Sequence, residues 1–138
     1  MKSTISVFTE PDRARLRRLI AAYRPYAYTN RVAIDTIESE LSRGSVVAPG
    51  AVPANVVTMN STVRIRDLGT EREETFTVVF PGTSDPTLGR TSVLSPVGMS
   101  VLGRRVGDVV EGPLRRWMRP ARIEEVISQP EREGRFDV

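Results

Sequence analysis

Apolar residues recur with a helical period through the first third of the chain. Between Thr9 and Tyr23 they fall three or four positions apart, which predicts an amphipathic helix. Thr9-Glu10-Pro11-Asp12 supplies a capping hydroxyl, an early proline and an acidic residue at its start. The same period predicts a second helix from about Arg31 to Arg43, ended by Gly44 as a C′ residue. The two stripes consist of Leu16, Leu19, Ile20 and Tyr23, and of Ala33, Ile34, Ile37 and Leu41.

Charge supports pairing of the two helices. The first helix is rich in arginine, whereas the second carries Asp35, Glu38 and Glu40, so an antiparallel hairpin places opposite charges across its seam. Residues 1–44 are therefore predicted to form a short N-terminal helical hairpin. Residues 45–54 contain two prolines and a glycine and are predicted to be a linker.

Beyond the linker the apolar period changes from 3.6 to 2, which is typical of half-buried antiparallel strands. Strands are predicted near residues 63–68, 76–80, 91–94, 109–114 and 118–127. Ser95-Pro96 reads as the cap and first residue of one short helix, which ends at Gly103. The predicted class is α+β, with residues 55–138 forming an antiparallel sheet domain whose tail is loose from about residue 128.

Composition limits the chemistry available to this fold. With 138 residues, 39% hydrophobic and 27% charged, the chain is typical of a folded globular protein. No apolar run approaches the roughly 18 residues that span a bilayer, and the start lacks the apolar core of a secretory signal, so we expect a cytoplasmic monomer with no membrane association. The chain contains no Cys and no His, which removes thiolate catalysis, the usual general base and the commonest metal ligand. We expect no cofactor and no metal.

Several motifs carry a family resemblance. They are Asn55-Val56-Val57-Thr58-Met59-Asn60-Ser61, Ser92-Val93-Leu94-Ser95-Pro96-Val97-Gly98, Leu102-Gly103 and Val106-Gly107-Asp108, with Ile34-Asp35-Thr36-Ile37 in the second helix. Together they resemble the Rnk (regulator of nucleoside diphosphate kinase) family, within the GreA/GreB superfamily of transcription elongation factors. The resemblance implies a coiled-coil-like hairpin joined to an FKBP-like C-terminal domain. It also implies that the partner is RNA polymerase, bound near the secondary channel.

The hairpin decides which activity of that superfamily the chain can have. The resemblance implies that Gre factors reach the polymerase active site with a long hairpin whose acidic tip helps to hold Mg²⁺, which requires carboxylates within coordination distance. Here the first helix has about fourteen residues, or roughly 21 Å at 1.5 Å per residue, and no acid lies between Tyr23 and Arg31. We predict a regulator of transcription elongation that is not an enzyme and does not stimulate transcript cleavage.

Other activities find less support. An FKBP-like fold suggests peptidyl-prolyl isomerase activity, but fold does not fix function, and the domain has few aromatics to line a proline pocket. Kinase activity on nucleoside diphosphates is excluded because the chain has no histidine to carry the phosphate.

The candidate polymerase-binding residues are Leu94, Ser95, Pro96 and Val97, with Asp35 in the hairpin. By resemblance, the first four match the segment with which Gre factors dock, although Leu94 stands where those factors have an acid. The structural alternative is that Ser95 caps the helix and Leu94 belongs to the core. Asp35 either contacts the polymerase or pairs with an arginine of the first helix, and we favour the pair.

Two further groups have both a structural and a functional interpretation. The tyrosines Tyr23, Tyr26 and Tyr28 could stack on a partner, but we expect them to pack the hairpin turn. A candidate basic patch consists of Arg104, Arg105, Arg115, Arg116, Arg119 and Arg122 around Trp117. Such a patch suits a weak contact with nucleic acid, which is the alternative function. Adjacent residues of a strand face opposite sides of the sheet, so Arg115 and Arg116 cannot both belong to one patch. We therefore favour the interpretation that these arginines lie on a solvated surface and that Trp117 belongs to the core.

Overall fold

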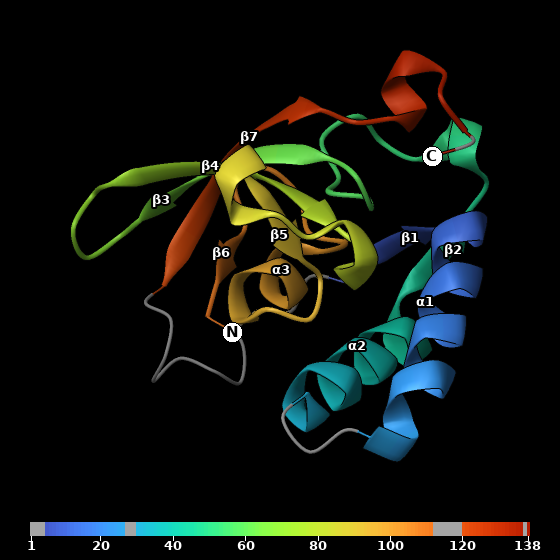
Figure 1. Cartoon of the computed structure of the whole chain (residues 1–138). Helices are drawn as coiled ribbons and strands as arrows, with labels where there is room; N and C mark the ends of the chain where they lie inside the picture. The colour runs from blue at the N-terminus through green and yellow to red at the C-terminus, as the bar shows by residue number, and fades with distance from the viewer. Residues whose placement is uncertain (1–4, 27–29, 112–119, 137) are drawn as a thin grey trace.

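The two predicted helices form a hairpin beside a curled β-sheet (Figure 1). The computed structural model describes residues 5–26, 30–111, 120–136 and 138. Helix α1 spans Glu10–Tyr23, the 3-10 turn η1 spans Arg24–Tyr26, and helix α2 spans Arg31–Arg43. Thr9 caps α1, because its side chain accepts a hydrogen bond from the Asp12 amide at 3.2 Å. Both helix predictions are confirmed, and no helix in the described ranges is long and apolar enough to cross a membrane.

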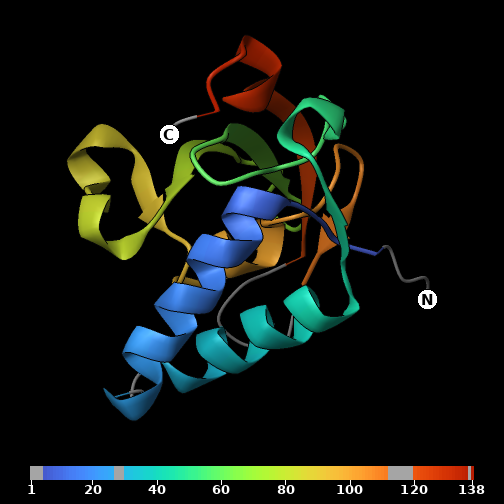
Figure 2. The same cartoon turned by 90° about the vertical axis from the view of Figure 1, so that its right-hand side faces the viewer.

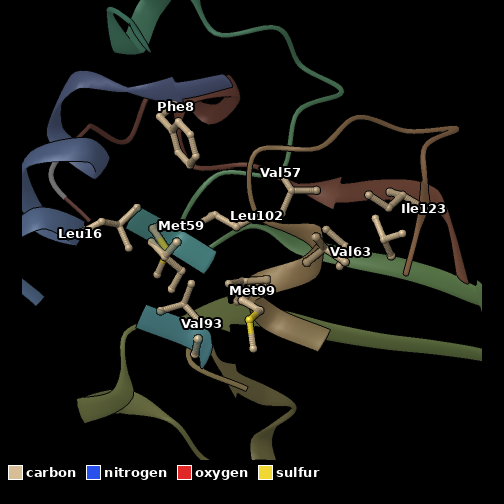
Figure 3. Close-up of a cluster of buried hydrophobic side chains, with 14 of the residues drawn as sticks. Phe8, Leu16, Val57, Met59, Val63, Val93, Met99, Leu102 and Ile123 are labelled. Carbon is tan, nitrogen blue, oxygen red and sulfur yellow. The ribbon is translucent and has the colours of Figure 1, made fainter. Parts of the chain in front are cut away.

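The apolar stripes of the hairpin are buried against the sheet domain. Leu16 and Ile34 have no exposed surface, and they belong to one hydrophobic cluster with Val63 of the sheet. Figure 3 shows Leu16 of α1 next to Met59, which precedes the first long strand. The hairpin therefore shares its core with the sheet domain, since a stripe of this kind is stable only when it is covered.

The main sheet has five strands in the order β5-β4-β3-β7-β6. The strands are β3 (Thr62–Asp67), β4 (Glu73–Val79), β5 (Arg90–Ser92), β6 (Val109–Val110) and β7 (Ala121–Ser128). The α+β class is confirmed, but the sheet is mixed, because β5 pairs with β4 in parallel. The period-2 pattern indicates a strand and not its direction, so the sequence could not reveal this crossover. Helix α3, Pro96–Val101, follows β5.

A second, two-stranded parallel sheet connects the hairpin to the sheet domain (Figure 2). It pairs β1, Val7–Thr9, with β2, Ser45–Val47. The start of the predicted linker is thus a strand. Gly44 ends α2 in an extended conformation, with φ −76°, so it is not the left-handed C′ residue that we predicted. Glycine is needed here because a Cβ would lie 2.7 Å from the Phe8 ring.

The C-terminal tail is attached to the domain, which differs from the loose tail predicted from about residue 128. Gln129 has no exposed surface, and its side-chain amide donates to the carbonyls of Pro53 and Val56 at 2.9 and 2.8 Å. The 3-10 turn η5, Glu131–Glu133, follows directly. The sequence pattern missed this attachment because one buried amide provides no periodicity.

Candidate functional site

The four candidate docking residues lie in a tight connection between β5 and α3. The carbonyl of Ser92 accepts hydrogen bonds from the Ser95 amide at 3.0 Å and from the Ser95 hydroxyl at 2.7 Å. The same hydroxyl accepts from the Gly98 amide at 3.1 Å, so Ser95 is the N-cap of α3, as predicted. These bonds fix the backbone on both sides of Leu94.

Gly98 allows this connection to close. A Cβ at position 98 would lie 2.2 Å from the Ser92 carbonyl oxygen, closer than any side chain tolerates. Glycine is required at this position because a side chain has no space, and not because of the backbone conformation, since Gly98 is helical and has no positive φ. We refer to Leu94–Val97 as the docking loop.

The docking loop presents an apolar, uncharged surface. Pro96 is exposed, whereas Leu94 and Val97 are half-buried and pack against the edge of the hydrophobic core. Leu94 therefore packs at the edge of the core, as the structural alternative held, and part of its surface stays accessible. From Thr91 to Val101 the chain has no ionisable side chain, so contact with a partner here would rest on shape and apolar burial.

The tip of the hairpin is closed by one arginine that binds two acids. Arg24 donates to Asp35 at 2.6 Å and to Glu38 at 2.5 Å. Asp35 is thus paired within the hairpin, but with the first residue of η1 and not with an arginine of the first helix. The side chain of Asp35 is still 55% exposed. Among the residues that the structure describes, no three acidic side chains gather to hold a metal ion.

The tyrosine prediction holds for one residue and fails for another. Tyr23 is half-buried and packs against the core, as expected. Tyr26 is 77% exposed, so the prediction that it packs the turn was wrong. It lies in η1, none of whose residues is buried. Tyr28 lies outside the described residues.

The described members of the candidate basic patch make local contacts. Arg104 lies 3.6 Å from Glu40 of α2, and Arg105 donates to the Ile5 carbonyl at 3.2 Å. Arg122 pairs with Glu124 on its own strand at 2.6 Å. Arg115, Arg116, Trp117 and Arg119 lie outside the described residues. The three described arginines thus make contacts within the protein, which leaves them less available to bind the phosphates of a nucleic acid.

A pair of neighbouring acids, buried Asp12 of α1 and half-buried Glu131 of the tail, was missed by sequence reasoning. Asp12 is 2% exposed, and burial is the main cause that raises the pKa of its carboxyl above the ordinary value. Glu131 from the tail lies close enough that the charge of Asp12 adds to the effect of burial, and its pKa is raised as well. The sequence placed Asp12 correctly in the first helical turn, where acids are common and usually exposed. Nothing local indicated its burial.

Comparison with known proteins places these features in context. Residues 52–128 match the family model described as transcription elongation factor GreA/GreB, C-terminal. The "Regulator of nucleoside diphosphate kinase" of Escherichia coli (strain K12) is 36% identical over 88 residues, which cover 64% of this chain and 65% of that protein. The "Transcription elongation factor GreA" of Thermodesulfovibrio yellowstonii is 35% identical over 77 residues, which cover 56% of this chain and 49% of that factor. The chain thus spans less than two thirds of the length of these relatives.

A solved structure extends the likeness to the hairpin. The prokaryotic transcription elongation factor GreA/GreB from Nitrosomonas europaea superposes with a TM-score of 0.73 at 35% sequence identity. The superposition covers 89% of this chain and 99% of that chain, so the arrangement of hairpin and sheet is similar in both.

Proposed function

Since the chain belongs to the GreA/GreB family of transcription elongation factors, we propose that it binds RNA polymerase near the secondary channel. There it acts as a non-catalytic regulator of elongation and competes with other factors that use the channel. The observation that carries this proposal is the docking loop, which is apolar, accessible and held rigid by the cap of α3. Preorganisation favours binding because little conformational entropy is lost on contact.

The hairpin supports a role without transcript cleavage. Helix α1 has 14 residues and α2 has 13, so each helix is only roughly 20 Å long, and the apolar stripes of both are buried against the sheet domain. Stimulated cleavage would require carboxylates that arrive together at a catalytic ion. Asp35 and Glu38 are both bound to Arg24, and neither lies at the tip itself. Asp35 remains the candidate contact from the hairpin, because about half of its side chain is exposed.

A pull-down with core RNA polymerase tests the proposal. The wild-type protein should be retained and should be displaced by a Gre factor in excess. The double variant Leu94→Asp, Pro96→Ala should lose most of this retention, because it places a charge in the apolar contact and removes the exposed ring. Leu68→Asp is the control, since Leu68 is a leucine with 39% exposure that directly follows β3 and lies outside the docking loop.

Two results would contradict the proposal. The first is that the wild-type protein is not retained by the polymerase under conditions in which a Gre factor is. The second concerns catalysis: addition of the protein to a backtracked polymerase should leave the RNA at full length, so shortening of the transcript would refute a non-cleaving role.

A further inference from the structure

The first turn of α1 is fastened to the sheet domain by a hydrogen bond from the backbone. The Met59 amide donates to Oδ2 of Asp12 at 2.9 Å, and both residues are almost fully buried. The other carboxylate oxygen, Oδ1, accepts from Nη2 of Arg15 at 2.6 Å. The carboxylate thus bridges a side chain of its own helix and the backbone of the sheet domain.

The partner backbone is held in place without the hairpin. Met59 belongs to the turn 58–61, in which the Thr58 amide donates to the Ser61 hydroxyl at 3.0 Å. The Asn60 amide donates to the Val78 carbonyl of β4 at 2.6 Å, and Asn60 adopts the left-handed conformation with φ 67°. Because these bonds fix the turn to the sheet, the Met59 N–H points at one defined place. A buried N–H without an acceptor is costly, so α1 is favoured only where Asp12 can meet it.

Arg15 adds a second contact between the same two parts. Its guanidinium lies 5.0 Å from the centre of the Phe80 ring, at the end of β4. A cation over an aromatic face is attracted by the ring, and the attraction grows when both groups leave water. The ion pair with Asp12 holds the guanidinium in this position. Asp12 and Arg15 therefore act as one unit that joins α1 to the sheet domain.

The tail meets the same turn. Oε1 of Glu131 accepts from the Thr58 hydroxyl at 2.7 Å, and that hydroxyl lies 2.8 Å from the Ser61 hydroxyl. The turn 58–61, which lies within one of the motifs that carried the family resemblance, thus joins the hairpin, the sheet and the tail.

Helix stability alone does not explain a buried acid at this position. Glu10 lies in the same first turn and is exposed, so it complements the helix dipole without losing its hydration. Burial of Asp12 carries a desolvation cost that the dipole does not require. The apolar stripe of α1 supplies attraction to the core, but apolar burial is not directional. A hydrogen bond to one fixed N–H is directional.

We propose that Asp12 is a positioning residue that, together with Arg15, locks the hairpin in one orientation on the sheet domain. The lock sets where the hairpin tip stands relative to the docking loop, so that both can meet one partner surface at once. This last step rests on the proposed function, whereas the lock itself is a property of the free protein.

Amide hydrogen exchange measured by NMR tests the lock in the free, full-length chain. In Asp12→Ala, the Met59 amide and the amides of α1 should exchange roughly 10–100-fold faster, which corresponds to the loss of a buried hydrogen bond to a charged group. The amides of β3 should keep their protection. Asp12→Asn retains an oxygen acceptor and should restore the protection of Met59. Glu10→Gln, which removes one charge from the same turn, should resemble the wild type.

Two outcomes would overturn the lock. Unchanged exchange at Met59 and α1 in Asp12→Ala would mean that apolar packing alone positions the hairpin. Equally faster amide exchange in α1 and β3 would mean that Asp12 contributes only to the stability of the whole fold and does not position the hairpin. If Asp12→Ala does not fold, Arg15→Met takes its place, because it removes the ion pair and the ring contact while it leaves the carboxylate as the acceptor for Met59. The amides of α1 should then exchange faster, and unchanged exchange in α1 would overturn the lock.

The functional consequence is measured separately. Asp12→Ala should still be retained by core polymerase through the docking loop, but it should compete at least several-fold less well with a Gre factor. Equal competition by the wild type and Asp12→Ala would contradict the coupling of hairpin and docking loop. Failure of the wild type to bind polymerase would contradict the proposed function instead, and the exchange experiment would still decide whether the lock exists.

Discussion

Replacement of Gly98 by alanine should destabilise the protein through a single close contact. The new Cβ would lie 2.2 Å from the Ser92 carbonyl oxygen, more than 1 Å inside the 3.4 Å at which ordinary contact begins. The obstructing atom belongs to the backbone, so it cannot turn aside as a flexible side chain would. Either α3 or the end of β5 must move.

The size of the effect follows from what that movement disturbs. Overpacking of a rigid site costs about 1–3 kcal/mol. The Ser92 carbonyl also accepts from both the amide and the hydroxyl of Ser95, and each weakened hydrogen bond contributes up to about 1 kcal/mol. We therefore expect Gly98→Ala to lower the free energy of unfolding by about 2–4 kcal/mol. Polymerase binding should weaken as well, because the docking loop begins next to the displaced carbonyl.

Urea unfolding followed by circular dichroism measures this change. With an m-value of about 1–3 kcal/mol per molar urea, the midpoint should fall by about 1 M or more. Gly82→Ala is the matched control, because a Cβ at that position meets no atom within 4 Å. Its midpoint should stay close to that of the wild type. A Gly98→Ala midpoint within the error of the wild type would show that the connection between β5 and α3 is not rigid.

Two further predictions concern the contacts of the hairpin. Gly44→Ala should lower the free energy of unfolding by about 1–3 kcal/mol, because its Cβ would lie 2.7 Å from the Phe8 ring. Gly50→Ala is the control and should leave the free energy of unfolding unchanged, because its Cβ meets open space. Equal urea midpoints for the two variants would contradict the reasoning. Burial raises the pKa values of Asp12 and Glu131 above their ordinary 3.8 and 4.5, so these two groups bind protons more readily in the folded state than in the unfolded chain. Their contribution to stability should therefore rise as the pH falls through the raised values towards the ordinary ones. Asp12→Asn, Glu131→Gln should show a smaller rise in denaturation experiments between pH 7 and 4, and parallel pH profiles would refute the assignment.

Local chemistry determined much of what could be predicted. The two hairpin helices were located because side chains three and four positions apart share a face. The starts of α1 and α3 were located because Thr9 and Ser95 cap them through bonds to residues only three positions away. The long strands were visible for the same reason, as period-2 alternation is a property of one segment alone. The start of α3 could also be located from sequence, since its cap Ser95 and its first residue Pro96 are consecutive.

Contacts between distant segments were decided only by the tertiary structure. The parallel pairing of β1 with β2 joins residues 7–9 to residues 45–47, and three-residue strands have no measurable period. Gly44 looked like a C′ glycine, but its neighbour is the ring of Phe8, far away along the chain.

Asp12 illustrates the physical reason for this division. In the sequence it is an acid in the first turn of a helix, and that much is correct. Its burial, its bond to the Met59 amide and its proximity to Glu131 depend on where the helix lies on the sheet domain. The sequence by itself determined where the helices and the long strands form and which reactive groups are missing. The structure decided how those elements meet, because burial and the direction of a hydrogen bond are properties of a pair of segments and not of either one.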